Sequence, residues 1–172
     1  DSITYGWAAS GMQDIRKPPY CEKYADMIVG ALEEKFGAKI EHVNFSVSGK
    51  CADWAAEEEN VKPVADFKPD LVILAFGMND AGGFRPRTFA ENIRKIIAAI
   101  RAEQPQAEFL LVSPIVPNPT VAFTAGSSIE RYHGEYPRAF EEIERAERGV
   151  GYANVTAVHR ILLERKSLQD TL

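Results

Sequence analysis

The chain has 172 residues, a formal net charge of −5 and a sequence pI near 5.3, with 45% hydrophobic and 26% charged residues. That length fits one domain with a sizeable core, and the composition is typical of a globular protein rather than a fibrous or disordered one. The acidic balance disfavours a nucleic-acid binder, because phosphate contacts need clustered Lys and Arg. We therefore expect a small uncharged or weakly polar ligand and no nucleic-acid partner.

The sequence also limits the membrane and metal chemistry that we expect. The longest apolar run, around "LVILAF", is too short to cross a bilayer, so we expect no transmembrane helix. No signal peptide is visible, although the abrupt start is consistent with a removed leader, so cytoplasmic and secreted locations both stay open. Cys21 and Cys51 can pair or stay free, and neither has a spacing typical of a zinc site. No heptad or apolar stripe requires a dimer, and the oligomeric state stays open.

The first third of the chain predicts a turn, a helix and a strand. The opening "DSITYG" is typical of the end of a strand and the turn after it. Apolar residues recur at helical spacing over residues 24–36, and Gly37 follows as a C-terminal stop. The segment "AKIEHVNFSVSG", residues 38–49, predicts a strand that ends at the turn residues Ser48 and Gly49.

The middle of the chain predicts two strands around one helix. The run "DLVILAF", from Asp70 to Phe76, is continuously apolar, as in a central parallel strand whose two faces are both covered. Thr88 and Glu91 have the spacing of a capping box, and an apolar stripe of Phe and Ile then predicts a helix that stops near Pro105. The run "EFLLVSPI" predicts the next strand.

The last third begins with a long loop and ends in a helix. Residues 117–134 are rich in Pro, Gly, Ser and Thr and predict the loop, after which "EYPRAFEEIERAERG" is helical in character up to Gly149. A short strand is predicted near Asn154 and Val155. The final helix carries the apolar residues Val158, Ile161, Leu162 and Leu163. Strands that alternate with helices predict an α/β domain with a parallel sheet and helices on both faces.

Ligands of such sheets bind beyond the carboxyl ends of the strands, so the residues after each strand are the candidates for chemistry. The stretches "DSITYG", "SVSGK" and "GMND" place Ser2, Gly49 and Asn79 there. A serine hydroxyl is a nucleophile once a base removes its proton, and glycine brings a backbone N–H close to a ligand. An Asn amide donates two hydrogen bonds without adding charge. These are the parts of a nucleophile and an oxyanion hole.

In order and spacing, "DSITYG", "SVSGK" and "GMND" resemble the first three sequence blocks of the SGNH or GDSL-type serine hydrolases. Asp1, Ser2 and Ile3 match the usual opening G-D-S with an aliphatic residue next, and the leading Gly is absent. The similarity runs over the whole chain, but few residues carry it.

The resemblance implies a flavodoxin-like three-layer sandwich with a parallel central sheet, and a set of site residues. Ser2 would be the nucleophile, with its own N–H as one oxyanion donor. Gly49 would supply a second donor through its backbone, and Asn79 a third through its side-chain amide. Asp1 and Asp80 would support their loops. The reaction needs no metal and no organic cofactor.

The family places its base on a D-x-x-H motif near the C-terminus, and residues 1–172 contain no such motif. His42 falls within the predicted strand, and His159 at the start of the last helix favours a structural role. Glu130 and His133 have an E-x-x-H spacing, and their loop can overhang the site, so this pair is the best rival.

We therefore expect residues 1–172 to be a single SGNH-hydrolase-like domain that is truncated at both ends. The first strand of the family would precede Asp1, and the base would follow Leu172. If the next residue is a histidine, Asp170 is the acid of the triad.

The leading hypothesis is a serine esterase that works through an acyl-enzyme and removes short acyl groups, such as acetyl, from a carbohydrate or another polar alcohol. The alternative is a non-catalytic domain of the same fold that binds a glycan or a protein partner. The single residues have plainer interpretations too: Ser2 as a helix N-cap, Gly49 as a turn glycine and "GMND" as an Asx-type turn. Large aromatic residues line either the pocket or the core: Trp7, Trp54, Phe84 and Phe123.

Overall fold

The computed structural model describes residues 2–5, 24–118 and 134–167 of the chain. It divides into two compact units, one made of residues before Lys50 and one that begins at Lys50. Each unit is described by itself below.

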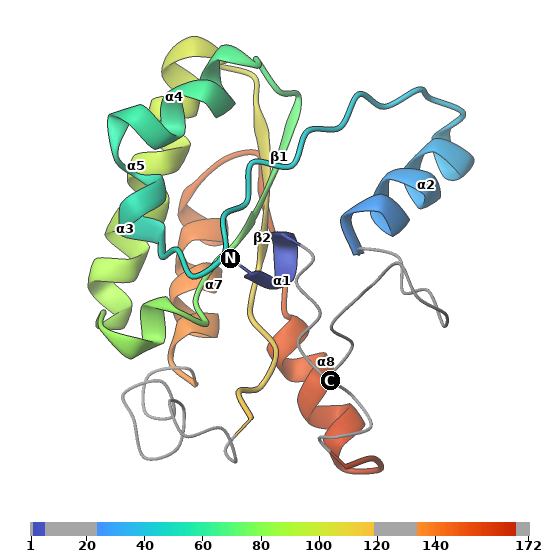
Figure 1. Cartoon of the computed structure of the whole chain (residues 1–172), viewed down its shortest axis with the longest axis vertical. Helices are drawn as coiled ribbons and strands as arrows, with labels where there is room; N and C mark the ends of the chain where they lie inside the picture. Colours follow the sequence, from blue (N-terminus) through green and yellow to red (C-terminus); the bar gives the residue numbers. More distant parts are fainter. Residues whose placement is uncertain (1, 6–23, 119–133, 168–172) are drawn as a thin grey trace. The chain divides into compact units, whose positions relative to one another are not determined.

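The first unit contains two helices, α1 (Ser2–Tyr5) and α2 (Tyr24–Phe36) (Figure 1). The predicted helix over residues 24–36 is confirmed, and it stops at Gly37, whose φ of 63° is the left-handed conformation that glycine adopts readily. The N–H of Gly37 donates to the carbonyl of Glu33 (2.9 Å). Ser2 is the first residue of α1.

The predicted strand over residues 38–47 is wrong, because the structure assigns no strand to this segment. An apolar alternation forms a strand only where a second strand supplies the ladder hydrogen bonds. No described residue pairs with this segment in that way, and its apolar side chains Val43, Phe45 and Val47 are exposed. The turn that we predicted after it is present, and Gly49 has a φ of 75°.

The second unit is built on three parallel strands in the order β1-β2-β3: β1 (Leu71–Ala75), β2 (Glu108–Val112) and β3 (Val150–Ala153). This sheet confirms the predicted α/β class with a parallel central sheet and is consistent with a flavodoxin-like sandwich. Strand β2 ends before Pro114, since proline has no N–H for a ladder. The strand predicted near Asn154 ends at Ala153 instead, because the Asn154 side chain caps the next helix through the N–H of Ala157 (3.0 Å).

Along the chain, the helices of the second unit alternate with its strands. They are α3 (Ala52–Ala55), α4 (Glu58–Asp66), the 3₁₀ turn η1 (Asp80–Gly82), α5 (Pro86–Glu103), α7 (Tyr136–Ala146) and α8 (Val155–Leu163). The sequence did not predict α3 or α4. Helices α3, α4, α5 and α7 lie together beside one face of the sheet (Figure 1).

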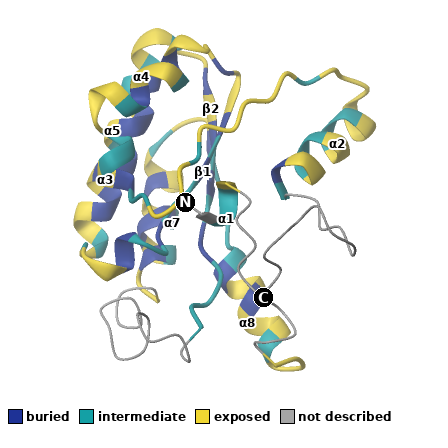
Figure 2. Cartoon of the chain, viewed as in Figure 1, coloured by how far each residue is buried: buried dark blue, intermediate teal, exposed yellow. Residues whose placement is uncertain are grey.

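The core lies between that helix layer and the sheet (Figure 2). On the sheet it contains Val72, Leu74, Phe109 and Leu111, which the strand register places on one face. From α5 and α7 it contains Phe89, Ile93, Ile97, Ile100, Phe140 and Ile143. The rings of Phe89 and Tyr136 stack at 4.4 Å between centroids. The other face of the strands is only half-buried.

The capping box that we predicted at Thr88 and Glu91 is wrong. Helix α5 already begins at Pro86, with Arg85 in extended backbone as its N-cap. Proline fits the first helical position because its fixed φ is pre-set for the helix and its missing N–H needs no partner. Glu91 instead accepts a hydrogen bond from Arg87 Nε (3.1 Å) one turn earlier. The predicted helix end before Pro105 is confirmed.

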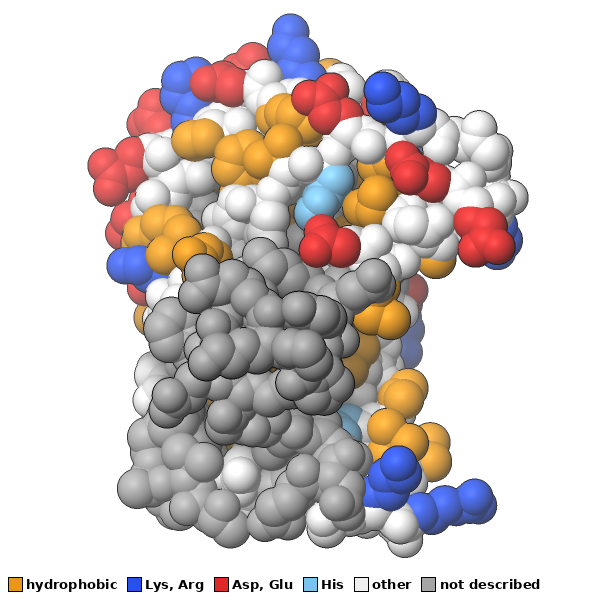
Figure 3. Space-filling view, turned by 45° about the vertical axis from the view of Figure 1, so that its right-hand side comes forward, with side chains coloured by type: hydrophobic (Ala, Val, Ile, Leu, Met, Phe, Trp, Pro, Cys, Tyr) orange, Lys and Arg blue, Asp and Glu red, His pale blue; other side chains and the backbone are white. Residues whose placement is uncertain are grey.

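The last helix, α8, exposes the apolar residues Val158, Ile161 and Leu162. Hydrophobic side chains gather beside basic ones at the lower right of Figure 3. None of the helices in the described ranges is both long and apolar enough to cross a membrane.

Candidate functional site

The loop after β1 makes a sharp turn that requires glycine at position 77. Gly77 has a φ of 121°, a conformation that residues with a side chain rarely adopt. A Cβ atom there would also lie 3.1 Å from Pro114 Cδ and 3.2 Å from Tyr136 Cδ2. Conformation and space together therefore fix the path of "GMND" as it leaves the sheet.

Asp80 holds this loop to the start of α3. Its side chain is fully buried, and its Oδ1 accepts a hydrogen bond from the N–H of Ala52 (2.7 Å). Its Oδ2 accepts from the N–H of Gly77 (3.0 Å). Burial raises the pKa of Asp80, although both backbone N–H groups act against the rise. Because the side chain of Cys51 does not cap α3, Asp80 satisfies this helix end from a distance.

The Asn79 side chain reaches a separate segment of the second unit. Its Nδ2 donates to the carbonyl of Lys50 (3.1 Å), and the amide is only half-buried. Asn79 stands at the N-cap of η1 but makes no side-chain capping bond there. The plain interpretation of "GMND" as an Asx-type turn is therefore wrong for Asn79. An amide carries two N–H donors, so the bond to Lys50 fixes its orientation and uses one of them.

Two of the aromatic residues that we expected to line either the pocket or the core lie in the second unit. Trp54, on α3, is half-buried, and the ammonium of Lys50 lies 5.2 Å from its ring centroid. Phe84 is half-buried, and its carbonyl accepts a hydrogen bond from the buried Tyr136 hydroxyl (2.7 Å). Trp7 and Phe123 lie outside the described residues.

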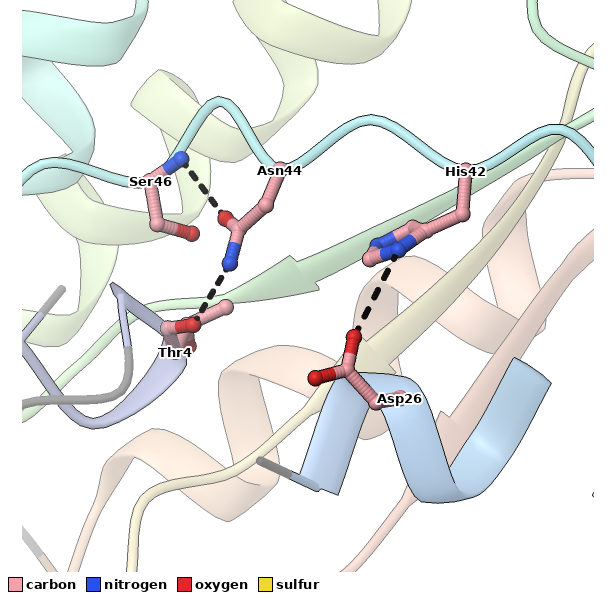
Figure 4. Close-up of polar contacts among 5 residues, drawn as sticks. All are labelled: Thr4, Asp26, His42, Asn44 and Ser46. Carbon is pink, nitrogen blue, oxygen red and sulfur yellow. Dashed lines mark hydrogen bonds and ion pairs between the residues drawn. The ribbon is translucent and has the colours of Figure 1, made fainter. Parts of the chain in front are cut away.

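The first unit holds the short helix that carries Ser2. Thr4 receives two hydrogen bonds, one from the Tyr24 hydroxyl to its Oγ1 (2.8 Å) and one from Asn44 Nδ2 to its carbonyl (2.9 Å). Asn44 Oδ1 accepts from the N–H of Ser46 (3.0 Å), which fixes the amide (Figure 4). Both α2 and the segment after it therefore hold α1 in place.

Gly49 is favoured by its backbone conformation rather than by crowding. Its φ of 75° suits glycine, and no heavy atom lies within 4 Å of the position that a Cβ would take. This geometry agrees with a turn glycine and also leaves room for a ligand beside the backbone. Ser2 and Gly49 belong to the first unit and Asn79 to the second, so the structure describes the local geometry of each within its own unit.

His159 has the wrong tautomer for a serine hydrolase base. It is buried, its Nδ1 accepts from the N–H of Val116 (2.9 Å), and burial lowers its pKa. The ring is therefore neutral with its proton on Nε2, whereas a triad histidine needs the proton on Nδ1 so that it can donate to the acid. This geometry agrees with the structural role expected for His159.

His42 has a carboxylate near it but makes no tight pair. Its Nδ1 lies 4.0 Å from Asp26 Oδ1, beyond hydrogen-bond length, and the side chains of His42 and Asp26 are 33% and 61% exposed (Figure 4). The rival residues Glu130 and His133 lie outside the described residues, as do Asp1 and the conditional acid Asp170.

Sequence reasoning missed a buried polar cluster where β2 and β3 end. Ser113 Oγ accepts from the N–H of Thr156 (3.1 Å), and Thr156 Oγ1 donates to the carbonyl of Pro114 (2.6 Å). Both side chains are almost fully buried, so these bonds attach the start of α8 to the end of β2. The polar Ser directly after the apolar run of β2 was the available signal.

Cys51, one residue before α3, is a free thiol. Burial, and then the negative charges of Asp80 and Asp53, raise its pKa to about 11. Cys21 lies outside the described residues. Within residues 2–5, 24–118 and 134–167, no three His, Cys, Asp or Glu side chains gather closely enough to hold a metal ion.

A scan against protein-family models matches the GDSL-like Lipase/Acylhydrolase family over residues 1–171. A search of curated proteins found no match. The family match covers nearly the whole chain and includes the three segments that carry Ser2, Gly49 and Asn79. The chain therefore belongs to the GDSL-like lipase and acylhydrolase family and is an ester-bond hydrolase.

Proposed function

We propose that the protein is a serine esterase that works through an acyl-enzyme. The Ser2 hydroxyl oxygen attacks the ester carbonyl carbon, and its proton passes through a base to the departing alcohol. Water then attacks the acyl-serine, which releases the carboxylic acid and restores Ser2. The N–H groups of Ser2 and Gly49 and the Asn79 amide would stabilise the negative oxygen that develops in both steps.

The observation that carries this proposal is the orientation of the Asn79 amide. Its Nδ2 donates to the carbonyl of Lys50 rather than to a group in its own turn. The amide is therefore pre-oriented before any substrate binds, and its second N–H is available to an oxyanion. Donors that need no reorganisation are the ones that lower the barrier most. Gly77 and Asp80, through their contacts, hold the loop that presents this amide.

The proposal assigns the base to a histidine outside the described residues. His159 holds its proton on the wrong nitrogen, and His42 makes no hydrogen bond to Asp26. If a histidine follows Leu172, the family resemblance makes Asp170 the acid of a D-x-x-H motif, and the pair Glu130 and His133 is the rival. Exchanging Asp170 and Glu130 for alanine, one at a time, distinguishes the two, because only the true acid lowers kcat strongly.

The decisive experiment replaces Ser2 by alanine. We expect Ser2→Ala to lower kcat for 4-nitrophenyl acetate by more than about 1,000-fold, because the covalent step is lost. Thr88→Ala removes an exposed hydroxyl on α5 and serves as the matched control, with unchanged turnover. Both variants should keep the far-ultraviolet circular dichroism of the parent. Turnover by Ser2→Ala near the parent rate would refute the assignment of Ser2.

Asn79→Ala tests the oxyanion assignment. Loss of one such donor lowers kcat by about 100- to 1,000-fold in other hydrolases, with a smaller effect on KM, since the charge develops only in the transition state. A change confined to KM would mean that Asn79 binds the ground state and does not stabilise the oxyanion.

For the substrate, we propose a short acyl group, such as acetyl, on a carbohydrate or another polar alcohol. The acidic net charge and the modest hydrophobicity of the chain support a polar substrate over a long lipid. Turnover of 4-nitrophenyl acetate should exceed that of the decanoate ester, and faster cleavage of the decanoate would reverse this choice. The alternative of a non-catalytic binding domain predicts that a fluorophosphonate probe fails to label Ser2.

A further inference from the structure

Lys50 carries a cation that is held on an aromatic ring. Its ammonium lies 5.2 Å from the ring centroid of Trp54, which is four residues further along the chain. Lys50 itself is half-buried. Throughout the described ranges, no carboxylate lies within 4.0 Å of this ammonium. Lys62, by contrast, pairs with Asp66 at 2.8 Å. The charge of Lys50 is therefore oriented without being neutralised.

The position of Lys50 links this cation to the ester chemistry. Its carbonyl accepts the hydrogen bond that orients the Asn79 amide, and its backbone nitrogen follows Gly49 directly. The cation thus belongs to the residue that joins two of the oxyanion donors proposed above. Lysine has a flexible stem of four carbons, so its ammonium can leave the ring and follow a substrate group near Asn79.

The chain around Lys50 carries negative charge, so Lys50 attracts an anion only at short range. The chain as a whole has a net charge of −5, and Asp53 and Asp80 are the carboxylates whose charge acts on the neighbouring Cys51. These carboxylates repel an anion, and Asp80 is committed to two backbone N–H groups. Lys50 is consequently a group in this part of the described structure that can attract an anionic substituent.

We propose that Lys50 is a specificity-determining residue that favours ester substrates with a carboxylate near the scissile ester. This inference rests on the proposed esterase function and narrows its substrate class. The substrate carboxylate would draw the Lys50 ammonium away from the face of Trp54. The carbonyl oxygen of the scissile ester would meanwhile face the Asn79 amide. Before binding, the contact between the ammonium and the Trp54 ring limits the rotamers of Lys50, so fewer of them have to be ordered when the carboxylate binds.

The test compares two acetyl esters that differ mainly in charge, 4-acetoxybenzoate and the neutral 4-acetoxybenzamide. The measured quantity is the ratio of kcat/KM for the anionic ester to kcat/KM for the neutral one. Lys50→Met should lower this ratio about tenfold, as expected for the loss of one partly shielded charge pair. Lys50→Arg should keep the ratio within about threefold of the parent, because it keeps the charge. Lys62→Met is the matched control and leaves ratio and activity unchanged.

A ratio that stays within about twofold of the parent in Lys50→Met overturns the proposal, since a contact charge must change it by more. Salt gives a second measurement that needs no variant. Raising NaCl from about 0.05 to 0.5 M should lower the ratio in the parent severalfold, because ions screen a solvent-accessible pair. A ratio that does not change with salt also contradicts the role of Lys50. Failure of the esterase proposal is recognised separately, because Ser2→Ala would then keep turnover of both esters.

Discussion

Replacing Asp80 by asparagine tests whether one buried carboxylate joins the candidate site to the start of α3. Each oxygen of Asp80 accepts a backbone N–H, from Ala52 at 2.7 Å and from Gly77 at 3.0 Å. Asparagine has the same shape but presents one oxygen and one NH₂ group. Whichever way the amide turns, a donor faces a donor, and one buried N–H loses its acceptor.

The magnitude follows from two opposing effects. An unsatisfied buried N–H costs about 1–3 kcal/mol, and the facing NH₂ of the amide adds a second unpaired donor of similar cost. Burial raises the pKa of Asp80, so its ionised form carries a desolvation penalty that a neutral amide avoids. This relief offsets part of the loss. We therefore expect Asp80→Asn to lower the free energy of unfolding by about 2–3 kcal/mol, a large share of the usual 5–15 kcal/mol.

Urea unfolding measured by circular dichroism gives the result directly. With an m value of about 2 kcal/mol/M, a loss of about 2 kcal/mol lowers the midpoint by about 1 M. Asp66→Asn is the matched control, because Asp66 and its partner Lys62 are both exposed and such a surface pair contributes little to stability. If Asp80→Asn loses no more stability than the control, the carboxylate is not the acceptor that joins the loop to α3, and our reasoning is wrong.

Three further predictions concern the same unit. Gly77→Ala should destabilise the protein by about 2–4 kcal/mol in urea, through strained backbone and contact with Pro114, and should lower kcat, whereas a loss below 1 kcal/mol would contradict the crowding. In a Cys21→Ala background, Cys51 should react with iodoacetamide at pH 8 about tenfold more slowly than in urea. Its raised pKa lowers the thiolate fraction about 100-fold against the ordinary value of 9.0, and higher thiolate nucleophilicity offsets part of this. Equal rates would contradict that burial. Because burial lowers the pKa of His159, its contribution to stability is present above about pH 6.5 and is lost as the pH falls towards the folded-state pKa. His159→Gln should therefore flatten the fall in urea midpoint between pH 7.5 and 5.5, and an unchanged slope would refute this.

Local sequence patterns correctly predicted two kinds of element. One is a helix whose end is set by a nearby residue, and the other is a strand that is apolar throughout. The helix over residues 24–36 and its stop at Gly37 follow from periodicity and from one left-handed residue. The strand that became β1 was recognisable because both faces of a central parallel strand are apolar. The order of the segments with Ser2, Gly49 and Asn79 likewise indicated the family before any coordinates.

The failed predictions mark where local signals compete or need a distant partner. Thr88 and Glu91 have the right spacing for a capping box, but Pro86 starts the helix two residues earlier. Residues 38–47 alternate as a strand does, yet a strand exists only through the hydrogen bonds of a neighbour. Neither outcome could be read from the pattern alone.

The sequence by itself determined which residues are candidates for the chemistry, because the order and spacing of three short segments resemble those of a known hydrolase family. Only the tertiary structure decided how those candidates are held. Asp80 bonds to a residue 28 positions away, and Asn79 to one 29 positions away. Such contacts depend on how β1 and α3 pack, which no local pattern encodes. The carbonyl that orients the Asn79 amide belongs to Lys50, whose ammonium lies over the ring of Trp54.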